Sequence, residues 1–186
     1  MDYGITDTHT HPSFPLSDRV RRAIWNMAWA VLFRTSPRPF HGWRRFILRC
    51  FGAKVGRGAH IYPNARIWAP WNVEIGEECG VAERVILYSQ GKIILGRRCV
   101  VSQGAHLCTG THDYSKPEFP LVTAPISVGD EAWLAAECFI LPGVEIGEGA
   151  VIGARSVVTR NIPSWMVCAG HPCKPIKPRK KFGQFD

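Results

Sequence analysis

The 186-residue sequence has no long apolar run: the densest one covers residues 23–33 and is interrupted by Asn26. A helix that crosses a bilayer needs about 20 consecutive apolar residues, so we expect no membrane-spanning segment. The first residues, MDYGITD, lack the basic and apolar regions of a secretory signal. These absences predict a cytoplasmic protein.

The sequence has no CxxC pair, and its seven cysteines cannot all be joined in disulfides because their number is odd. A disulfide framework and a structural zinc site are therefore disfavoured, and we expect reduced cysteines and no metal.

Acidic residues are scarce at both ends of the chain. Residues 1–60 hold ten Lys and Arg against three Asp and Glu, and residues 161–186 hold five against one, whereas the middle is slightly acidic. No nucleic-acid-binding module is recognisable, so we expect no nucleic-acid partner. Basic ends suit an anionic membrane surface or a phosphate-bearing cofactor.

What the sequence does contain is a six-residue repeat. From Val55 onward an aliphatic residue recurs at every sixth position, with two-residue shifts after Val73 and Ile93 and one long gap after Leu107. The seventeen positions are Val55, Ile61, Ile67, Val73, Ile75, Val81, Leu87, Ile93, Leu95, Val101, Leu107, Val128, Leu134, Ile140, Ile146, Ile152 and Val158.

Two companion patterns follow the same period. Four residues after each aliphatic position a small side chain dominates, as at Ala59, Ala65, Cys79, Gly91, Cys99, Ala105, Thr111, Ala132, Cys138, Ala150 and Ser156. One residue after it, Gly recurs at positions 56, 76, 96, 129, 147 and 153, where we expect the chain to bend. A period of six does not fit an α-helix. It predicts an all-β triangular solenoid, three hexads to a coil, with coils stacked about 4.8 Å apart.

The pattern divides the chain into three parts. Residues 1–52 are predicted to form a helical extension, residues 53–163 the solenoid and residues 164–186 a basic tail. Within the extension we expect helices at 17–34 and 40–51. These helices either cap the end of the solenoid or rest their Trp and Arg side chains on a membrane surface, and the two roles are compatible.

The repeat is interrupted by 15 residues at 113–127 (DYSKPEFPLVTAPIS), and a long loop in a regular solenoid is typically functional. The loop departs directly after His112. Because an imidazole can take up a proton near neutral pH, His112 is the candidate general base. Asp113 and Tyr114 are candidates for orienting it or for contacting the acceptor.

Three segments resemble the hexapeptide-repeat acetyltransferases: THDYSKPEFP, PISVGDEAWLAAECFILPGVEIGEGAVIGARSVVTRNIP and AGHPCKPIKPR. Together with IWAPWN and QGAHLCTGTHDY they are most similar to the acetyltransferases of colanic-acid-type exopolysaccharide synthesis. The resemblance covers roughly residues 50–179. It implies a left-handed β-helix, a homotrimer with active sites between subunits, and acetyl-CoA as co-substrate.

The resemblance also implies roles for individual residues. His112 falls on the family's catalytic base, which would act without an acyl-enzyme intermediate. Contacts to coenzyme A would fall on Ala136, Ala154, Thr159, Arg160, Lys174 and Lys177. Relatives often have Arg at the last two positions, and Lys is a point charge without the bidentate fork of Arg. An acceptor-binding Asn of the sugar enzymes falls on Ala82, so neighbouring Glu83 is the candidate substitute. The acceptor would be a sugar hydroxyl of an exopolysaccharide precursor, lipid-linked and at the inner face of the membrane.

Three other hypotheses are weaker. A γ-type carbonic anhydrase needs three His ligands, and only His106 and His112 have suitable spacing. A non-catalytic scaffold does not account for the loop at His112. The sequence DTHTH at residues 7–11 imitates a metal motif of amidohydrolase barrels, but the chain is too short for that barrel, and we expect a flexible terminus there.

Overall fold

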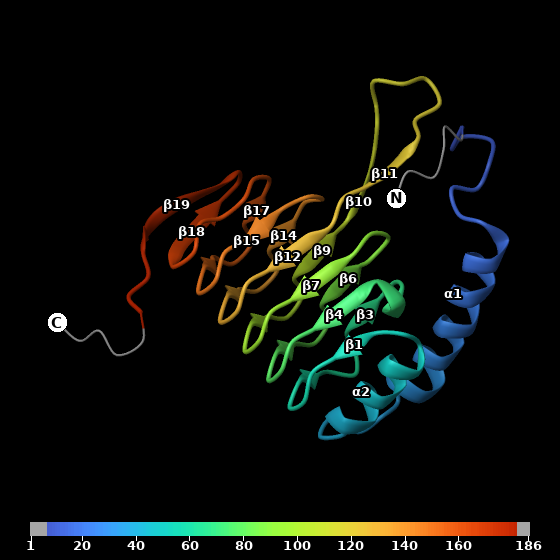
Figure 1. Cartoon of the computed structure of the whole chain (residues 1–186), viewed down its shortest axis with the longest axis horizontal. Coiled ribbons are helices and arrows are strands. Elements are labelled where there is room, and N and C mark those ends of the chain that lie inside the picture. Colours follow the sequence, from blue (N-terminus) through green and yellow to red (C-terminus); the bar gives the residue numbers. More distant parts are fainter. Residues whose placement is uncertain (1–6, 182–186) are drawn as a thin grey trace.

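The computed structural model describes residues 7–181, and these form a parallel β-solenoid with a helical cap on its first coil (Figure 1). Three helical segments precede the solenoid: α1 (Leu16–Ala28), the π-helical turn η1 (Trp29–Phe33) and α2 (His41–Cys50). A 3₁₀ turn, η2 (Pro70–Asn72), lies at one corner of the first coil. The predicted helices at 17–34 and 40–51 thus have counterparts in the fold. Among the described residues, no helix is long and apolar enough to span a bilayer.

The solenoid has three faces, each a sheet of parallel strands, except that the last strand of the second face, β19, is antiparallel to its neighbour. The first face consists of β1 (Lys54–Val55), β4 (Val73–Ile75), β7 (Ile93–Leu95), β12 (Ile126–Val128) and β15 (Glu145–Ile146). The second consists of β2 (His60–Ile61), β5 (Gly80–Val81), β8 (Val100–Val101), β13 (Trp133–Leu134), β16 (Val151–Ile152), β18 (Met166–Gly170) and β19 (Cys173–Pro178). The third consists of β3 (Arg66–Ile67), β6 (Ile86–Tyr88), β9 (His106–Cys108), β14 (Phe139–Ile140) and β17 (Val157–Val158). The hexapeptide repeats match a left-handed β-helix, as predicted.

The core consists of the predicted aliphatic positions. All seventeen are buried, and the most exposed of them, Val55, is 7% exposed. The small companion positions are buried too, with two exceptions. Thr111 is exposed and Gly91 half-buried, whereas Thr109 and Ser89 are fully buried. The prediction for Thr111 was wrong because the corner after the third face carries two extra residues, which moves the inward place from the fourth to the second residue after the aliphatic.

The recurring glycines have a different cause from the one expected. Except for Gly153, the predicted glycines lie where the backbones of successive coils approach each other most closely. A Cβ added to Gly76 would lie 2.5 Å from the carbonyl carbon of Gly96, and one added to Gly96 would lie 2.6 Å from the nitrogen of Asp130. Such distances are shorter than any van der Waals contact. The glycine column is therefore required by coil stacking and not by the bend itself.

Each coil accepts hydrogen bonds from the N–H groups of the preceding coil at a fixed set of carbonyls, as Ile75 does from Gly56 at 2.7 Å and Val81 from Tyr62 at 3.0 Å. The carbonyls at the matching places of the first coil, such as those of Val55 and Ile61, have no preceding coil to supply a donor. Buried carbonyls without a partner cost free energy, so this end of the solenoid needs a cap made of donors.

The helices supply those donors from Trp and Arg side chains. The indole Nε1 of Trp25 donates to the carbonyl oxygen of Ile67 at 2.7 Å, and that of Trp29 to the oxygen of Ala65 at 2.9 Å. Arg45 and Arg49 donate in the same way to the carbonyl oxygens of Ala59 and Val55. Indole and guanidinium groups carry donors and no acceptor. The capping role of the extension follows from this match.

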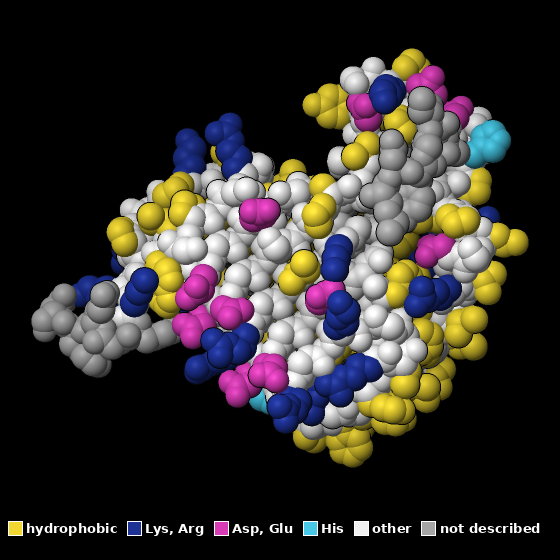
Figure 2. Space-filling model, viewed as in Figure 1, with side chains coloured by type: hydrophobic (Ala, Val, Ile, Leu, Met, Phe, Trp, Pro, Cys, Tyr) yellow, Lys and Arg dark blue, Asp and Glu magenta, His cyan; other side chains and the backbone are white. Residues whose placement is uncertain are grey.

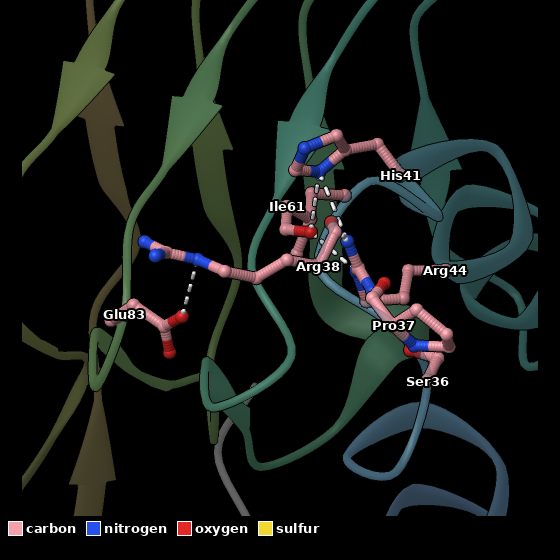
Figure 3. Close-up of polar contacts among 7 residues, drawn as sticks. All are labelled: Ser36, Pro37, Arg38, His41, Arg44, Ile61 and Glu83. Carbon is pink, nitrogen blue, oxygen red and sulfur yellow. Dashed lines mark hydrogen bonds and ion pairs between the residues drawn. The ribbon is translucent and has the colours of Figure 1, made fainter.

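Arg44 is a fully buried arginine that also caps the first coil (Figure 3). Its guanidinium donates to the carbonyl oxygens of Ile61 at 2.5 Å and Pro37 at 2.9 Å, and to the hydroxyl of Ser36 at 2.8 Å. Burial lowers its pKa from the ordinary range of arginine. The group is held by carbonyl oxygens instead of by a carboxylate, so it joins α2, the preceding loop and the first coil.

We predict that Trp25→Phe lowers the free energy of unfolding by about 1–3 kcal/mol, because it leaves the buried Ile67 carbonyl without a donor. Trp43→Phe is the matched control: its indole donates to Leu32, but the side chain is 41% exposed, so water can replace the lost donor. Urea unfolding of both variants measures the difference. Equal losses would contradict the capping account.

Candidate active site

The interruption of the repeat forms a hairpin that stands out from the solenoid (Figure 1). Its strands are β10 (Gly110–His112) and β11 (Leu121–Thr123), which pair antiparallel. At its base the backbone N–H of Ala124 donates to the carbonyl of Thr109 at 2.9 Å. The hairpin begins at Gly110, three residues before the predicted excursion 113–127, and it ends before buried Ile126, which pairs with Ile93 of the preceding coil.

His112 is held on two sides within this hairpin. Its ring stacks on Phe119 with the centroids 4.3 Å apart and the planes 7° from parallel. Its Nδ1 lies 2.7 Å from the carbonyl oxygen of Phe119. A carbonyl oxygen can only accept, so this contact requires a proton on Nδ1. In the neutral ring the Nε2 lone pair is then left free to accept a proton.

The N-terminal segment holds Phe119 from the other side. The Thr8 hydroxyl donates to the Phe119 carbonyl oxygen at 2.5 Å, and the Thr8 N–H donates to the Glu118 carbonyl at 3.1 Å. The ring of His9 stacks on Phe119 with the centroids 5.8 Å apart. The expectation of a flexible terminus at residues 7–11 therefore missed a contact that supports the wall behind His112. No periodic signal in the sequence marks it.

Asp113 and Tyr114 do not contact the imidazole in the described structure. The Asp113 carboxylate accepts hydrogen bonds from the hydroxyl of Ser115 at 2.5 Å and from its N–H at 3.1 Å, and Lys116 lies 3.6 Å away. The Ser115 hydroxyl, followed by its N–H and Lys116, holds the pKa of Asp113 below its usual range. Tyr114 is 89% exposed on the hairpin. His112 is thus oriented by a backbone carbonyl.

Several other candidate residues lie along a different edge of the three-sided solenoid, or prism. Glu83, Ala136 and Ala154 all stand where the second face turns into the third. Backbone bonds link this edge from coil to coil: Gly104 donates to Glu83, Glu137 to Gln103, and Arg155 to Ala136. The structure therefore brings one acceptor candidate and two cofactor candidates into a single column.

The remaining cofactor candidates lie elsewhere. Thr159 and Arg160 follow β17 and are exposed at the edge between the third and first faces, the edge from which the hairpin departs. Lys174 and Lys177 are exposed on β19, which pairs antiparallel with β18 beside the second face. One copy of the chain thus distributes the candidate site over separate edges.

Glu83 lines a cleft of about 600 Å³ together with Arg38, His60, Tyr62, Ala82 and Arg84. Its Oε1 lies 3.4 Å from Nε of Arg38, which reaches over from the segment before α2 (Figure 3). Its Oε2 is buried and has no hydrogen-bond partner among the described residues. The cleft thus offers one carboxylate oxygen and several cations to a polar ligand.

His106 belongs to a different environment. Its ring lies between Phe139, with centroids 4.6 Å apart, and Tyr88, with centroids 6.2 Å apart. Burial lowers its pKa from 6.5. Within residues 7–181 no three His, Cys, Asp or Glu side chains are grouped so that they could hold a metal ion.

Comparison with known proteins agrees with the fold. Residues 125–160 match the family model of the bacterial transferase hexapeptide (six repeats). The chain is 40% identical over 160 residues to a candidate colanic acid biosynthesis acetyltransferase, WcaF, of Escherichia coli (strain K12), covering 86% of this chain and 88% of that protein.

Two solved structures share the fold. The maltose O-acetyltransferase of Clostridium difficile 630 has a TM-score of 0.78 and 27% identity, covering 87% of this chain and 88% of that one. A hexapeptide-repeat acetyltransferase of Vibrio cholerae, solved with acetyl coenzyme A, has a TM-score of 0.82 and 18% identity, covering 97% and 100%. The fold and the similarity to these acetyltransferases define an acyltransferase of the solenoid type. The chain belongs to the hexapeptide-repeat acetyltransferase family.

We predict that nitrogen NMR of the labelled protein assigns neutral His112 to the tautomer with its proton on Nδ1, because the Phe119 carbonyl accepts from that atom. Unfolding the protein in denaturant should abolish this preference, which gives the internal control. A native signal from the Nε2–H tautomer would contradict the geometry described for the base.

Proposed function

We propose that this enzyme transfers an acetyl group from acetyl-CoA to a sugar hydroxyl of an exopolysaccharide precursor, with His112 as general base. The observation that carries the proposal is the bond between Nδ1 of His112 and the Phe119 carbonyl, because it leaves Nε2 as the free base. The name of the Escherichia coli relative supports a polysaccharide acceptor. The maltose enzyme and the Vibrio cholerae complex support O-acetyl transfer and acetyl-CoA.

The reaction needs one proton acceptor and no covalent enzyme intermediate. The sugar oxygen attacks the thioester carbonyl carbon while Nε2 of His112 takes the hydroxyl proton. Backbone N–H groups near the hairpin would stabilise the oxyanion. The carbon–sulfur bond then breaks, and the coenzyme A thiolate leaves and takes the proton from the imidazolium. The Phe119 carbonyl stabilises the transient imidazolium charge through the proton on Nδ1.

The cofactor would lie along the edge that carries Ala136 and Ala154, where small side chains let a pantetheine arm approach the solenoid wall. Thr159, Arg160, Lys174 and Lys177 would surround its polar and phosphate groups. The two lysines are exposed, so they can reach phosphate as point charges, without the bidentate geometry that Arg would give.

A homotrimer would complete the site. His112 belongs to the hairpin at one edge of the prism, whereas Glu83, Ala136 and Ala154 belong to another. In a cyclic assembly the hairpin of one copy meets a different edge of its neighbour. This arrangement would bring the base of one subunit to the cofactor and acceptor residues of the next.

The acceptor would be part of a lipid-linked precursor at the inner face of the membrane. The Glu83 cleft supports this choice, because its carboxylate can bind sugar hydroxyls while Arg38 and Arg84 can bind phosphate. Tyr114 and Asp113 on the neighbouring hairpin would contact the acceptor from the other side.

We predict that His112→Ala lowers turnover by about 10²- to 10⁴-fold, the range for loss of a general base. Binding of coenzyme A, thermal unfolding and oligomeric state should stay near those of the parent protein. The measurement is free thiol release from acetyl-CoA across a panel of sugar acceptors. Near-normal turnover of the variant with the best acceptor would overturn the mechanism.

A second prediction concerns the shared site. Ala154→Trp should block the cofactor edge and inactivate the enzyme. Co-refolding this variant with His112→Ala should then restore activity that neither has alone, because some sites receive an intact base and an intact edge from different chains. Mixing the two variants after assembly is the control. If co-refolded mixtures stay inactive while mixed trimers form, the site lies within one chain.

A further inference from the structure

The helix α1 is apolar on two opposite sides, and the solenoid uses only one of them. Trp25 is fully buried against the first coil. On the opposite side Leu16 is 70% exposed, Val20 50%, Ile24 51% and Met27 64%. The core is therefore complete without these four side chains. Their exposure has no explanation in the folding of the single chain.

The same exposed surface continues past α1. We call it the helical apolar surface, and it consists of Leu16, Val20, Ile24, Met27, Val31, Leu32, Phe40, Trp43 and Phe46. Figure 2 shows apolar side chains gathered along the helical side of the molecule. Between η1 and α2 the surface contains a groove of about 720 Å³, lined among others by Val31, Leu32, Phe40, Trp43 and Phe46. An apolar patch of this extent on a folded chain typically marks an interaction site.

The charge around this surface is of one sign. Residues 16–53 contain eight arginines and a single acidic residue, Asp18. That carboxylate is already bound by Arg22 at 3.0 Å. Arg19, Arg34, Arg38 and Arg49 are exposed. The long stems of arginine can cover apolar surface while the charged ends reach a polar layer.

From these observations we infer that the helical apolar surface docks on an anionic phospholipid bilayer, with α1 lying in the plane of the membrane. The aliphatic side chains enter the acyl boundary, Trp43 lies at the level of the headgroups, and the arginines meet lipid phosphates. The attachment is peripheral, since none of the described helices could span the bilayer.

Charge complementarity favours lipid over a second copy of the chain. Many of the acidic side chains of the solenoid are already neutralised by basic residues of the same chain. Glu74 pairs with Lys54 and Lys92, Glu77 with Arg57, and Glu137 with Arg155. Glu78 and Asp130 are likewise paired, with Arg98 and Arg97. An anionic bilayer offers unpaired negative charge over the whole length of the helix.

The test is binding of the full chain to vesicles, without acetyl-CoA or sugar, so that its outcome does not depend on the proposed reaction. Vesicles of phosphatidylcholine with phosphatidylglycerol are compared with vesicles of phosphatidylcholine alone by co-sedimentation. We expect binding to the anionic vesicles only, weakened by added salt.

Ile24→Asp should lower partition into anionic vesicles by about tenfold or more, because it removes one inserted aliphatic side chain and adds a repelled charge. Asn26→Asp is the matched control: it adds the same charge to α1, two residues away and off the helical apolar surface, and should change partition less than about threefold. Both positions are exposed, so circular dichroism should be unchanged.

Three outcomes would overturn the inference. The protein could fail to bind anionic vesicles, or bind neutral vesicles equally well, or lose binding equally in the two variants. Light scattering provides a further check. Association beyond the trimer that Ile24→Asp abolishes, in the absence of vesicle binding, would assign the surface to a second copy instead. None of these results would touch the acyl-transfer proposal.

Discussion

The need to pair the backbone groups of the terminal coils shapes both ends of this molecule. The carbonyls of the first coil that would face a preceding coil need donors, and Trp25, Trp29 and Arg44 provide them. At the far end β18 accepts from Gly153 and then pairs antiparallel with β19, which uses the groups that another coil would have taken. The two ends thus have different caps. Arginine and tryptophan side chains suit the first coil because they supply donors to its outward carbonyls.

The stacking of the coils also determines how the candidate site residues are distributed. Stacking coils in fixed register places equivalent residues in columns along the edges, so Glu83 and Ala136 share an edge although they are far apart in sequence. A departing hairpin can occupy only one edge. His112 is therefore rigidly separated from the column of Ala136 and Ala154 within its own chain, and the prism cannot bend to bring them together. The proposed site therefore requires contact between copies of the chain.

The sequence predicts the solenoid well because each inward place is a local steric requirement repeated every six residues. It fails where a requirement is not periodic. Thr111 was assigned inward by counting four residues from Leu107. The corner there carries two extra residues, and the long loop that follows hides the resulting shift of the repeat. The contact of Thr8 with Phe119 joins residues 111 apart and has no repeat to reveal it. His112 was found by position and by resemblance, but the carbonyl that orients it required the fold of the hairpin.

The helix α1 could not be interpreted from its apolar pattern alone, because that pattern has two sides. Its aliphatic residues suggest the buried face, yet the buried residue is Trp25, whose indole can both fill space and donate to a carbonyl. An aliphatic side chain in that place would leave Ile67 unsatisfied. The need for donors at the first coil thus selects the side with tryptophan and turns the aliphatic side outward. Capping and the proposed membrane docking are therefore compatible. Burial of Trp25 leaves the aliphatic side of α1 exposed, and that side belongs to the surface proposed to dock.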